Sequence, residues 1–156
     1  MRLRNFLAAS ALALSGAVYA ADPACSTYSG PHTTALVELY TSEGCDSCPA
    51  ADHWLSSLFA RGFSPDRVVP LALHVDYWDY MGWKDPFAKG EFSMRQRKLA
   101  QMRRPVIVYT PQVLLQGQDF RRWGSDRFAE EVTRINSRAA RAKIALTIRS
   151  VEPTFM

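Results

Sequence analysis

The sequence predicts an α/β fold, in which short apolar strands alternate with amphipathic helices around one hydrophobic core. The chain has 156 residues, 47% of them hydrophobic and 22% charged, as in ordinary single globular domains. Apolar segments at 36–40 and 68–75 are each followed by a pattern of helical spacing. The nine Pro and eight Gly are scattered, with no repeat or low-complexity tract. Disordered and fibrous classes are therefore excluded.

The first half of the chain predicts two strands and one helix. Leu36–Tyr40 has the apolar composition of a short strand. From Ala50 to about Ala60 large apolar residues recur at helical spacing, and Gly62 marks the end of that helix. Val68–Val75 is almost continuously apolar, as expected of a central strand that is buried on both faces. Pro70 in this run predicts a bulge or a later strand start.

The second half predicts two further helices and two further strands. A helix is expected over Phe87–Met102, and apolar residues 106–109 lead into a strand at Gln112–Leu115. Ser125 is a suitable N-cap for a helix that extends to about Ala139. Ile144–Ile148 alternates apolar and polar residues like a half-buried strand, for which the sequence offers no partner strand.

The first twenty residues have the pattern of a secretory signal peptide. Arg2 and Arg4 give a basic start, Phe6–Val18 is apolar, and small residues precede a cleavage point after Ala20. An uncleaved N-terminal anchor is the alternative, although the run is short for a membrane span. We expect a periplasmic or secreted protein with no membrane attachment after cleavage. Residues 21–34, which contain Cys25, are expected to be a flexible mature N-terminus.

The charge balance gives little support for nucleic-acid binding. The chain has 19 Lys and Arg against 15 Asp and Glu, a net charge of +4. One loose basic cluster falls on the second predicted helix and comprises Arg95, Arg97, Lys98, Arg103 and Arg104. A solvated helix face is the simpler interpretation of such a cluster. We therefore predict no nucleic-acid partner.

Two cysteines separated by two residues form the chemical centre of the sequence. Cys45 and Cys48 follow a predicted strand and open a predicted helix, where backbone N–H groups and the helix dipole favour a thiolate. Cys45, the outer and more exposed residue, is expected to attack a substrate disulfide, and Cys48 to close back and release the product. Asp46 opposes thiolate formation by charge repulsion, which indicates a mild, more reducing thiol.

Other uses of the cysteine pair remain open. A purely structural disulfide on a binding protein is one alternative, because an oxidising compartment would keep the pair closed. A copper relay through Cys45, Cys48 and His74 is another, since thiolates and imidazole suit copper. Structural zinc is disfavoured because no second CxxC exists. No metal or organic cofactor is predicted, as no Gly-rich nucleotide loop appears.

Two other segments are candidates for substrate contact. The Thr110–Pro111 bond precedes a predicted strand, and a cis geometry there would expose backbone groups to an extended substrate. An ordinary trans Pro at a strand start is equally compatible with the sequence. Between His74 and Phe87 the chain is rich in aromatics, of which Tyr77, Trp78 and Trp83 are candidates for a substrate groove or for a cap on the core.

These segments, in this order, resemble the thioredoxin fold. More narrowly, the stretches 37–45, 74–88 and 109–112 are similar to a secreted bacterial thioredoxin-like family that carries a domain of unknown function. The resemblance covers roughly residues 35–135. It implies a thioredoxin-like fold over 35–141, with a central mixed sheet flanked by helices. It also implies export and a further β-rich region, of which 142–156 is the start and which is truncated in this chain.

The resemblance also implies a role for Glu38. In thioredoxins a buried carboxylate on the strand before the CxxC moves the proton of the inner cysteine, and Glu38 lies on the matching strand. An exposed strand position is the alternative. Gly44 replaces the usual Trp, and Asp46 and Ser47 replace the usual Gly-Pro, so broad reductase activity is not implied. The expected function is thiol–disulfide exchange with a thiol or disulfide of an exported protein or small molecule.

Overall fold

A four-stranded mixed sheet forms the centre of the protein, which is represented by a computed structural model that describes residues 25–102 and 107–148. The strand order is β3-β2-β4-β5, with β2 at Ala35–Thr41, β3 at Val68–His74, β4 at Gln112–Leu115 and β5 at Gln118–Asp119. Helices lie on both faces of this sheet. The architecture therefore matches the α/β class and the central mixed sheet predicted from the sequence, and is consistent with a thioredoxin-like fold.

Strand β2 lies inside the sheet because it pairs on both edges, and both of its neighbours are distant in sequence. It pairs in parallel with β3, from Ala35 opposite Val68 to Thr41 opposite His74. On its other edge it pairs antiparallel with β4, where Tyr40 lies opposite Gln112. Strand β4 directly follows Pro111. Its pairing with β2 therefore brings the Thr110–Pro111 segment to the end of β2 at which the cysteine turn begins.

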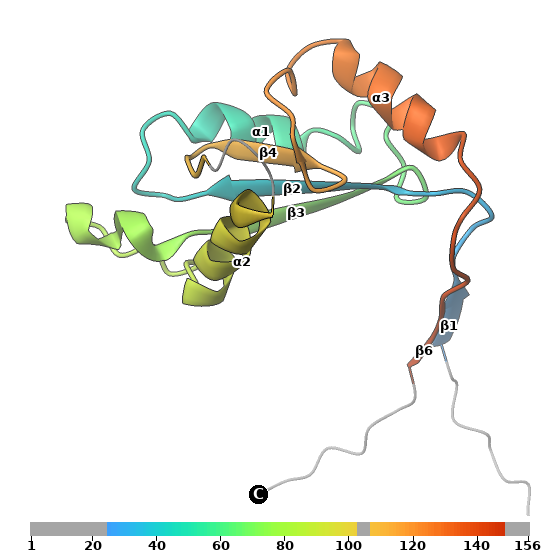
Figure 1. The fold of residues 1–156 in the computed structure, drawn as a ribbon, viewed down its shortest axis with the longest axis horizontal. Helices are drawn as coiled ribbons and strands as arrows, with labels where there is room; N and C mark the ends of the chain where they lie inside the picture. Colours follow the sequence, from blue (N-terminus) through green and yellow to red (C-terminus); the bar gives the residue numbers. More distant parts are fainter. Residues whose placement is uncertain (1–24, 103–106, 149–156) are drawn as a thin grey trace, which may run out of the picture. The chain divides into compact units, whose positions relative to one another are not determined.

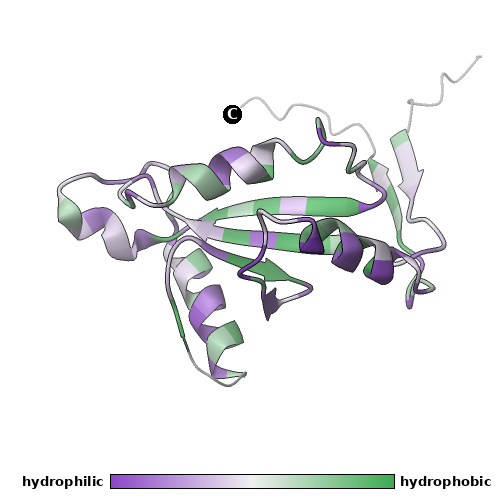
Figure 2. Ribbon diagram, turned by 90° about the horizontal axis from the view of Figure 1, so that it is seen from above, coloured by the Kyte–Doolittle hydropathy of each residue, from purple (hydrophilic) through white to green (hydrophobic). Residues whose placement is uncertain are grey.

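The three helices divide the apolar residues between two cores (Figure 1). α1 (Pro49–Ser56) and α3 (Arg127–Asn136) pack on one face, where the buried cluster includes Val37 and Leu39 of β2. α2 (Gly90–Gln101) covers the other face, where Tyr40 is buried. Hydrophobic residues concentrate along the strands of the central sheet, whereas the helices carry both hydrophobic and hydrophilic residues (Figure 2). Adjacent β2 residues point to opposite faces, so one strand supports both cores.

The observed helices are shorter than their predicted counterparts. α1 ends at Ser56 and continues as turns, which leaves Phe59 exposed although the spacing predicts a buried position. α2 begins at Gly90 rather than Phe87. α3 has Asp126 as its N-cap, while Ser125 instead donates its hydroxyl to the Arg122 carbonyl. An additional 3-10 helix, η1 (Asp76–Met81), occupies part of the aromatic segment.

The chain divides into two compact units, residues 28–145 and the two end segments. β1 (Cys25–Tyr28) pairs with β6 (Ala145–Ile148) in a two-stranded sheet, most of whose residues belong to the end segments. The expectation that the last strand lacks a partner is thus wrong, and part of the region expected to be flexible is a strand. All residues of both strands are exposed.

Several predictions concern residues outside the described ranges. The signal peptide at 1–20, residues 103–106 and the end of the predicted C-terminal β segment, 149–156, all lie there. Among the described residues no helix is long and apolar enough to cross a lipid bilayer.

Candidate functional site

Cys45 and Cys48 form a disulfide at the start of α1, with Cα atoms 5.4 Å apart. Cys48 is the N-cap residue, and its carbonyl accepts hydrogen bonds from the first-turn amides of Ala51 and Asp52. Pro49 occupies the first helical position, where its missing N–H costs nothing. The two cysteines are 2% and 0% exposed, so the expected exposure of Cys45 is not found in this oxidised form.

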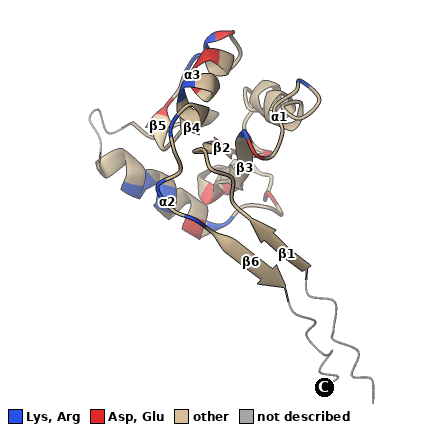
Figure 3. Cartoon of the chain, turned by 90° about the vertical axis from the view of Figure 1, so that its right-hand side faces the viewer, with Lys and Arg blue, Asp and Glu red and all other residues tan. Residues whose placement is uncertain are grey.

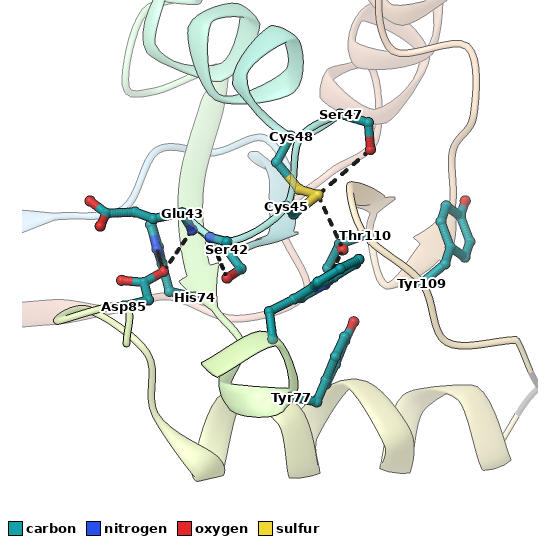
Figure 4. The surroundings of a disulfide bond; sticks show 12 residues. Ser42, Glu43, Cys45, Ser47, Cys48, His74, Tyr77, Asp85, Tyr109 and Thr110 are labelled. Carbon is teal, nitrogen blue, oxygen red and sulfur yellow. Dashed lines mark hydrogen bonds and ion pairs between the residues drawn. A yellow bond between two sulfur atoms is a disulfide. The ribbon is translucent and has the colours of Figure 1, made fainter. Parts of the chain in front are cut away.

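The Cys45 sulfur receives a hydrogen bond from a residue 65 positions away in sequence. Thr110 Oγ1 donates to Cys45 Sγ at 3.4 Å, and the Trp78 indole N–H donates to the same Thr110 hydroxyl at 2.7 Å. Ser47 Oγ lies 3.6 Å from the same sulfur (Figure 4). The Thr110–Pro111 peptide bond is cis. Two hydroxyl groups thus surround the outer sulfur, and the indole fixes the direction of one of them.

The three aromatic candidates take different positions. Tyr77 donates its hydroxyl to the buried amide of Gln96 and packs, with Trp78, against the core beneath α2. Trp83 is 58% exposed, and its indole N–H donates to Glu43 Oε2 at 2.8 Å. Tyr77 and Trp78 therefore cap a core, while Trp83 presents an aromatic surface beside the cysteine turn. Trp78 has two roles, because it packs against the core and its indole N–H also donates a hydrogen bond to Thr110.

An Asp–His pair that sequence reasoning missed holds the turn before Cys45. The buried Asp85 carboxylate lies 2.6 Å from His74 Nδ1 and accepts the backbone N–H of Glu43 at 2.9 Å and that of Phe87 at 2.8 Å. Burial alone would raise the pKa of Asp85, but these hydrogen bonds outweigh it and hold that pKa below its ordinary value of 3.8. The Asp-rich composition of residues 76–85 was the only sequence signal for such a pair.

Asp85→Asn is expected to destabilise the protein by about 2 kcal/mol at neutral pH, because charge-assisted hydrogen bonds become neutral ones. A carboxyl group whose pKa is lowered on folding stabilises the native state above its unfolded pKa, and this stabilisation is lost as pH falls through the folded value. The wild-type free energy of unfolding should therefore decline faster than that of Asp85→Asn below about pH 4. Urea titrations over this range test the difference, and parallel pH profiles would contradict it.

Glu38 is buried as expected, but its partner is Arg95 of α2. The carboxylate is 1% exposed, and the Arg95 side chain, 51% exposed, donates Nε to Glu38 Oε1 at 2.7 Å. This hydrogen bond raises the pKa of Arg95. Burial and the adjacent Glu38 charge raise the pKa of Tyr40 to about 12. Val37 and Leu39 face α1, and alternate strand residues point to opposite faces, so the Glu38 side chain lies on the face of β2 that α2 covers. There it forms an ion pair with Arg95.

Neither Cys25 nor His74 forms a metal-binding group with Cys45 and Cys48 in the described part of the chain. Cys25 is a free, exposed cysteine in β1. His74 is paired with Asp85. Over residues 25–102 and 107–148, no three His, Cys, Asp or Glu side chains form a group suited to a metal ion. The set Cys45, Cys48 and His74 required for a copper relay is thus not assembled there.

Comparisons with known proteins identify a family rather than an activity. No curated protein matches the chain. A crystal structure of protein AGR_C_4864 from Agrobacterium tumefaciens is similar, with 38% sequence identity and a TM-score of 0.55. The similarity covers 69% of this chain and 46% of that protein, so the chain spans about half of that protein's length. The model of a protein family of unknown function, DUF1223, matches residues 36–155, and the chain therefore belongs to this family.

Proposed function

We propose that this protein exchanges thiols and disulfides through Cys45 and Cys48. The observation that carries the proposal is the Thr110 hydroxyl that donates to Cys45 Sγ at the start of α1. A disulfide with a purely structural role needs no such donor, whereas a thiolate released from Cys45 is stabilised by it. We also propose that exchange takes place after export, which rests on the signal-peptide pattern of residues 1–20.

The exchange proceeds in two balanced steps. In the reduced protein the Cys45 thiolate attacks one sulfur of a substrate disulfide, a mixed disulfide forms, and the other substrate sulfur leaves as a thiolate. Cys48 then loses its proton to solvent or buffer and attacks Cys45 Sγ. The Cys45–Cys48 bond re-forms and the second substrate thiolate leaves. Two electrons pass from the protein to the substrate, and the reverse sequence oxidises a substrate dithiol.

The direct test is exchange by the purified protein in a Cys25→Ser background, which removes the third thiol. The protein is equilibrated in glutathione buffers of defined ratio, and the fraction of Cys45–Cys48 disulfide is measured after acid quench and alkylation. Reduction of the neutral disulfide bis(2-hydroxyethyl) disulfide is followed separately. Reversible titration together with turnover supports the proposal. A disulfide that stays closed in millimolar dithiothreitol while the protein is folded would indicate a structural bond instead.

Thr110→Val is expected to slow the alkylation of reduced Cys45 about 10-fold at neutral pH. A hydrogen bond to a charged group contributes about 1.5–3 kcal/mol, and its loss reduces the thiolate population. Thr110→Ser keeps the hydroxyl and should react like the wild type. The rates are measured with iodoacetamide in the Cys25→Ser background at several pH values. Equal rates for Val and Ser would show that the hydroxyl does not act on the sulfur.

A further inference from the structure

A groove of about 430 Å³ lies directly beside the Thr110 segment. Its lining residues are Ile107, Tyr109, Pro111, Arg121 and Trp123. Four of them are apolar or aromatic, and Trp123 packs against Trp54 of α1 with ring centroids 5.2 Å apart. The groove is thus lined by Pro111, which follows the residue that contacts Cys45 Sγ, and by Trp123, which packs against the helix capped by Cys48. A side chain next to a reacting substrate cysteine can occupy it.

Arg121 forms the polar end of this groove and also lines a larger cleft of about 890 Å³ between the β4–β5 edge and α3. The cleft is strongly basic, since five arginines line it against two carboxylates, Asp119 and Glu131. The arginines are Arg121, Arg122, Arg127, Arg134 and Arg138. Figure 3 shows basic and acidic residues together along α3.

The cleft carboxylates are already engaged. Asp119 pairs with Arg121 at 3.0 Å and accepts the Tyr109 hydroxyl at 2.6 Å. Glu131 pairs with Arg127 and Arg134. Among the described residues, Arg122 and Arg138 form no ion pair with a carboxylate. The cleft therefore retains an excess of positive charge that an anionic ligand can neutralise.

We propose that the substrate is a polypeptide whose reactive cysteine is flanked by an apolar or aromatic residue and then by acidic residues. This inference rests on the proposed exchange function and specifies its substrate. The apolar residue occupies the groove at Pro111 and Trp123, and the carboxylates extend past Arg121 into the cleft. An apolar groove and a basic cleft that share Arg121 suit an extended chain better than a single small anion, which would use only one of them.

The sequence of events at the sulfurs follows from this placement. Cys45 attacks the disulfide sulfur of the bound peptide, and the thiol that was paired with that sulfur leaves. Cys48 then attacks Cys45 Sγ, the protein disulfide re-forms, and the peptide leaves as a free thiol. Only the approach of the peptide depends on charge. The bonds formed and broken are the same for every peptide.

The test compares peptides that differ only in charge. Each carries a cysteine blocked as a disulfide with 2-mercaptoethanol, a neighbouring Tyr, and then three Glu, three Gln or three Lys residues. Reduction by the Cys25→Ser protein is expected to be about 10-fold faster for the Glu than for the Lys peptide at low salt, the lower end of electrostatic steering effects. The difference should shrink as salt screens it. Bis(2-hydroxyethyl) disulfide serves as the neutral reference.

Matched variants locate the effect. Arg122→Gln with Arg138→Gln, and separately Arg121→Gln, should each reduce the rate for the Glu peptide relative to the rate for the neutral disulfide. Arg61→Gln removes one exposed charge elsewhere and should leave the preference unchanged. Equal rates for the three peptides, with normal turnover of the neutral disulfide, would overturn the substrate inference alone. A preference equally lost in Arg61→Gln would also overturn it. Failure to reduce any disulfide would refute the exchange function itself.

Discussion

Cys48→Ser is expected to trap a mixed disulfide between Cys45 and its substrate, with a lifetime extended by about 10³-fold or more. The resolving attack by Cys48 is intramolecular, and well-oriented groups of this kind act at effective concentrations far above those of thiols in solution. Without Cys48, release must await a second molecule of thiol. Mass spectrometry of the acid-quenched protein, incubated with bis(2-hydroxyethyl) disulfide, measures the adduct on Cys45 over time.

Cys45→Ser provides the matched control. Cys48 is fully buried in the described structure, and it is the Cys45 sulfur that receives the Thr110 hydrogen bond. This variant is therefore expected to form no adduct under the same conditions. Both variants carry Cys25→Ser, so that an adduct reports only on the CxxC pair. Adducts of equal yield and lifetime in the two variants would contradict the assignment of Cys45 as nucleophile and Cys48 as resolving thiol.

Arg95→Ala is expected to destabilise the protein by about 3 kcal/mol. It leaves the Glu38 carboxylate buried without its guanidinium partner, and breaking a buried pair in this way costs about 3–5 kcal/mol. The lower value applies because Arg95 itself is half-exposed. The free energy of unfolding is measured by urea titration. Lys98→Ala, an exposed residue on the same helix, is expected to change it by less than about 0.5 kcal/mol.

A double variant separates the two members of this pair. Glu38→Gln in the Arg95→Ala background removes the uncompensated charge, so the double variant should be more stable than Arg95→Ala alone. If the double variant were less stable than Arg95→Ala, the ion pair would not be the source of the loss.

The rate of thiol–disulfide exchange by Glu38→Gln tests a second property of this residue. A longer-lived mixed disulfide would support the proton-carrying role expected from the resemblance, despite the pairing with Arg95.

The sheet, the helices and part of the site could be predicted because their signals are local. Apolar runs identify β2 and β3, helical spacing identifies the region of α1, and the CxxC lies between a strand and a helix. Thr110, which the sequence analysis names as a substrate contact, donates a hydrogen bond to Cys45 Sγ, and its role toward a substrate stays a prediction. The position of Thr110–Pro111 before a predicted strand made it a candidate, but an ordinary trans Pro at a strand start was equally compatible with the sequence.

The rest could not be predicted, because it depends on pairs that the sequence does not mark. Arg95 and Glu38 are 57 positions apart, and the basic cluster on the predicted helix looked like a solvated face. Asp85 appeared as one of several acids in an aromatic segment, although it supports the turn before Cys45. The burial of Cys45 depends on what the fold brings over it. The sequence placed that residue at the outer edge of its motif, where exposure is the ordinary expectation.

The long sequence separation between Cys45 and Thr110 has a consequence for the order of assembly. β2, the cysteine turn and α1 are contiguous in the chain, whereas the residues of β4 pair with β2 from 72 to 78 positions away. Before β4 pairs with β2, the Thr110 hydroxyl does not contact Cys45 Sγ, and one edge of β2 has no partner strand. The thiols of a newly made chain are consequently accessible to external oxidants before the fold closes over them. We therefore expect the CxxC pair to be oxidised faster during folding than after it.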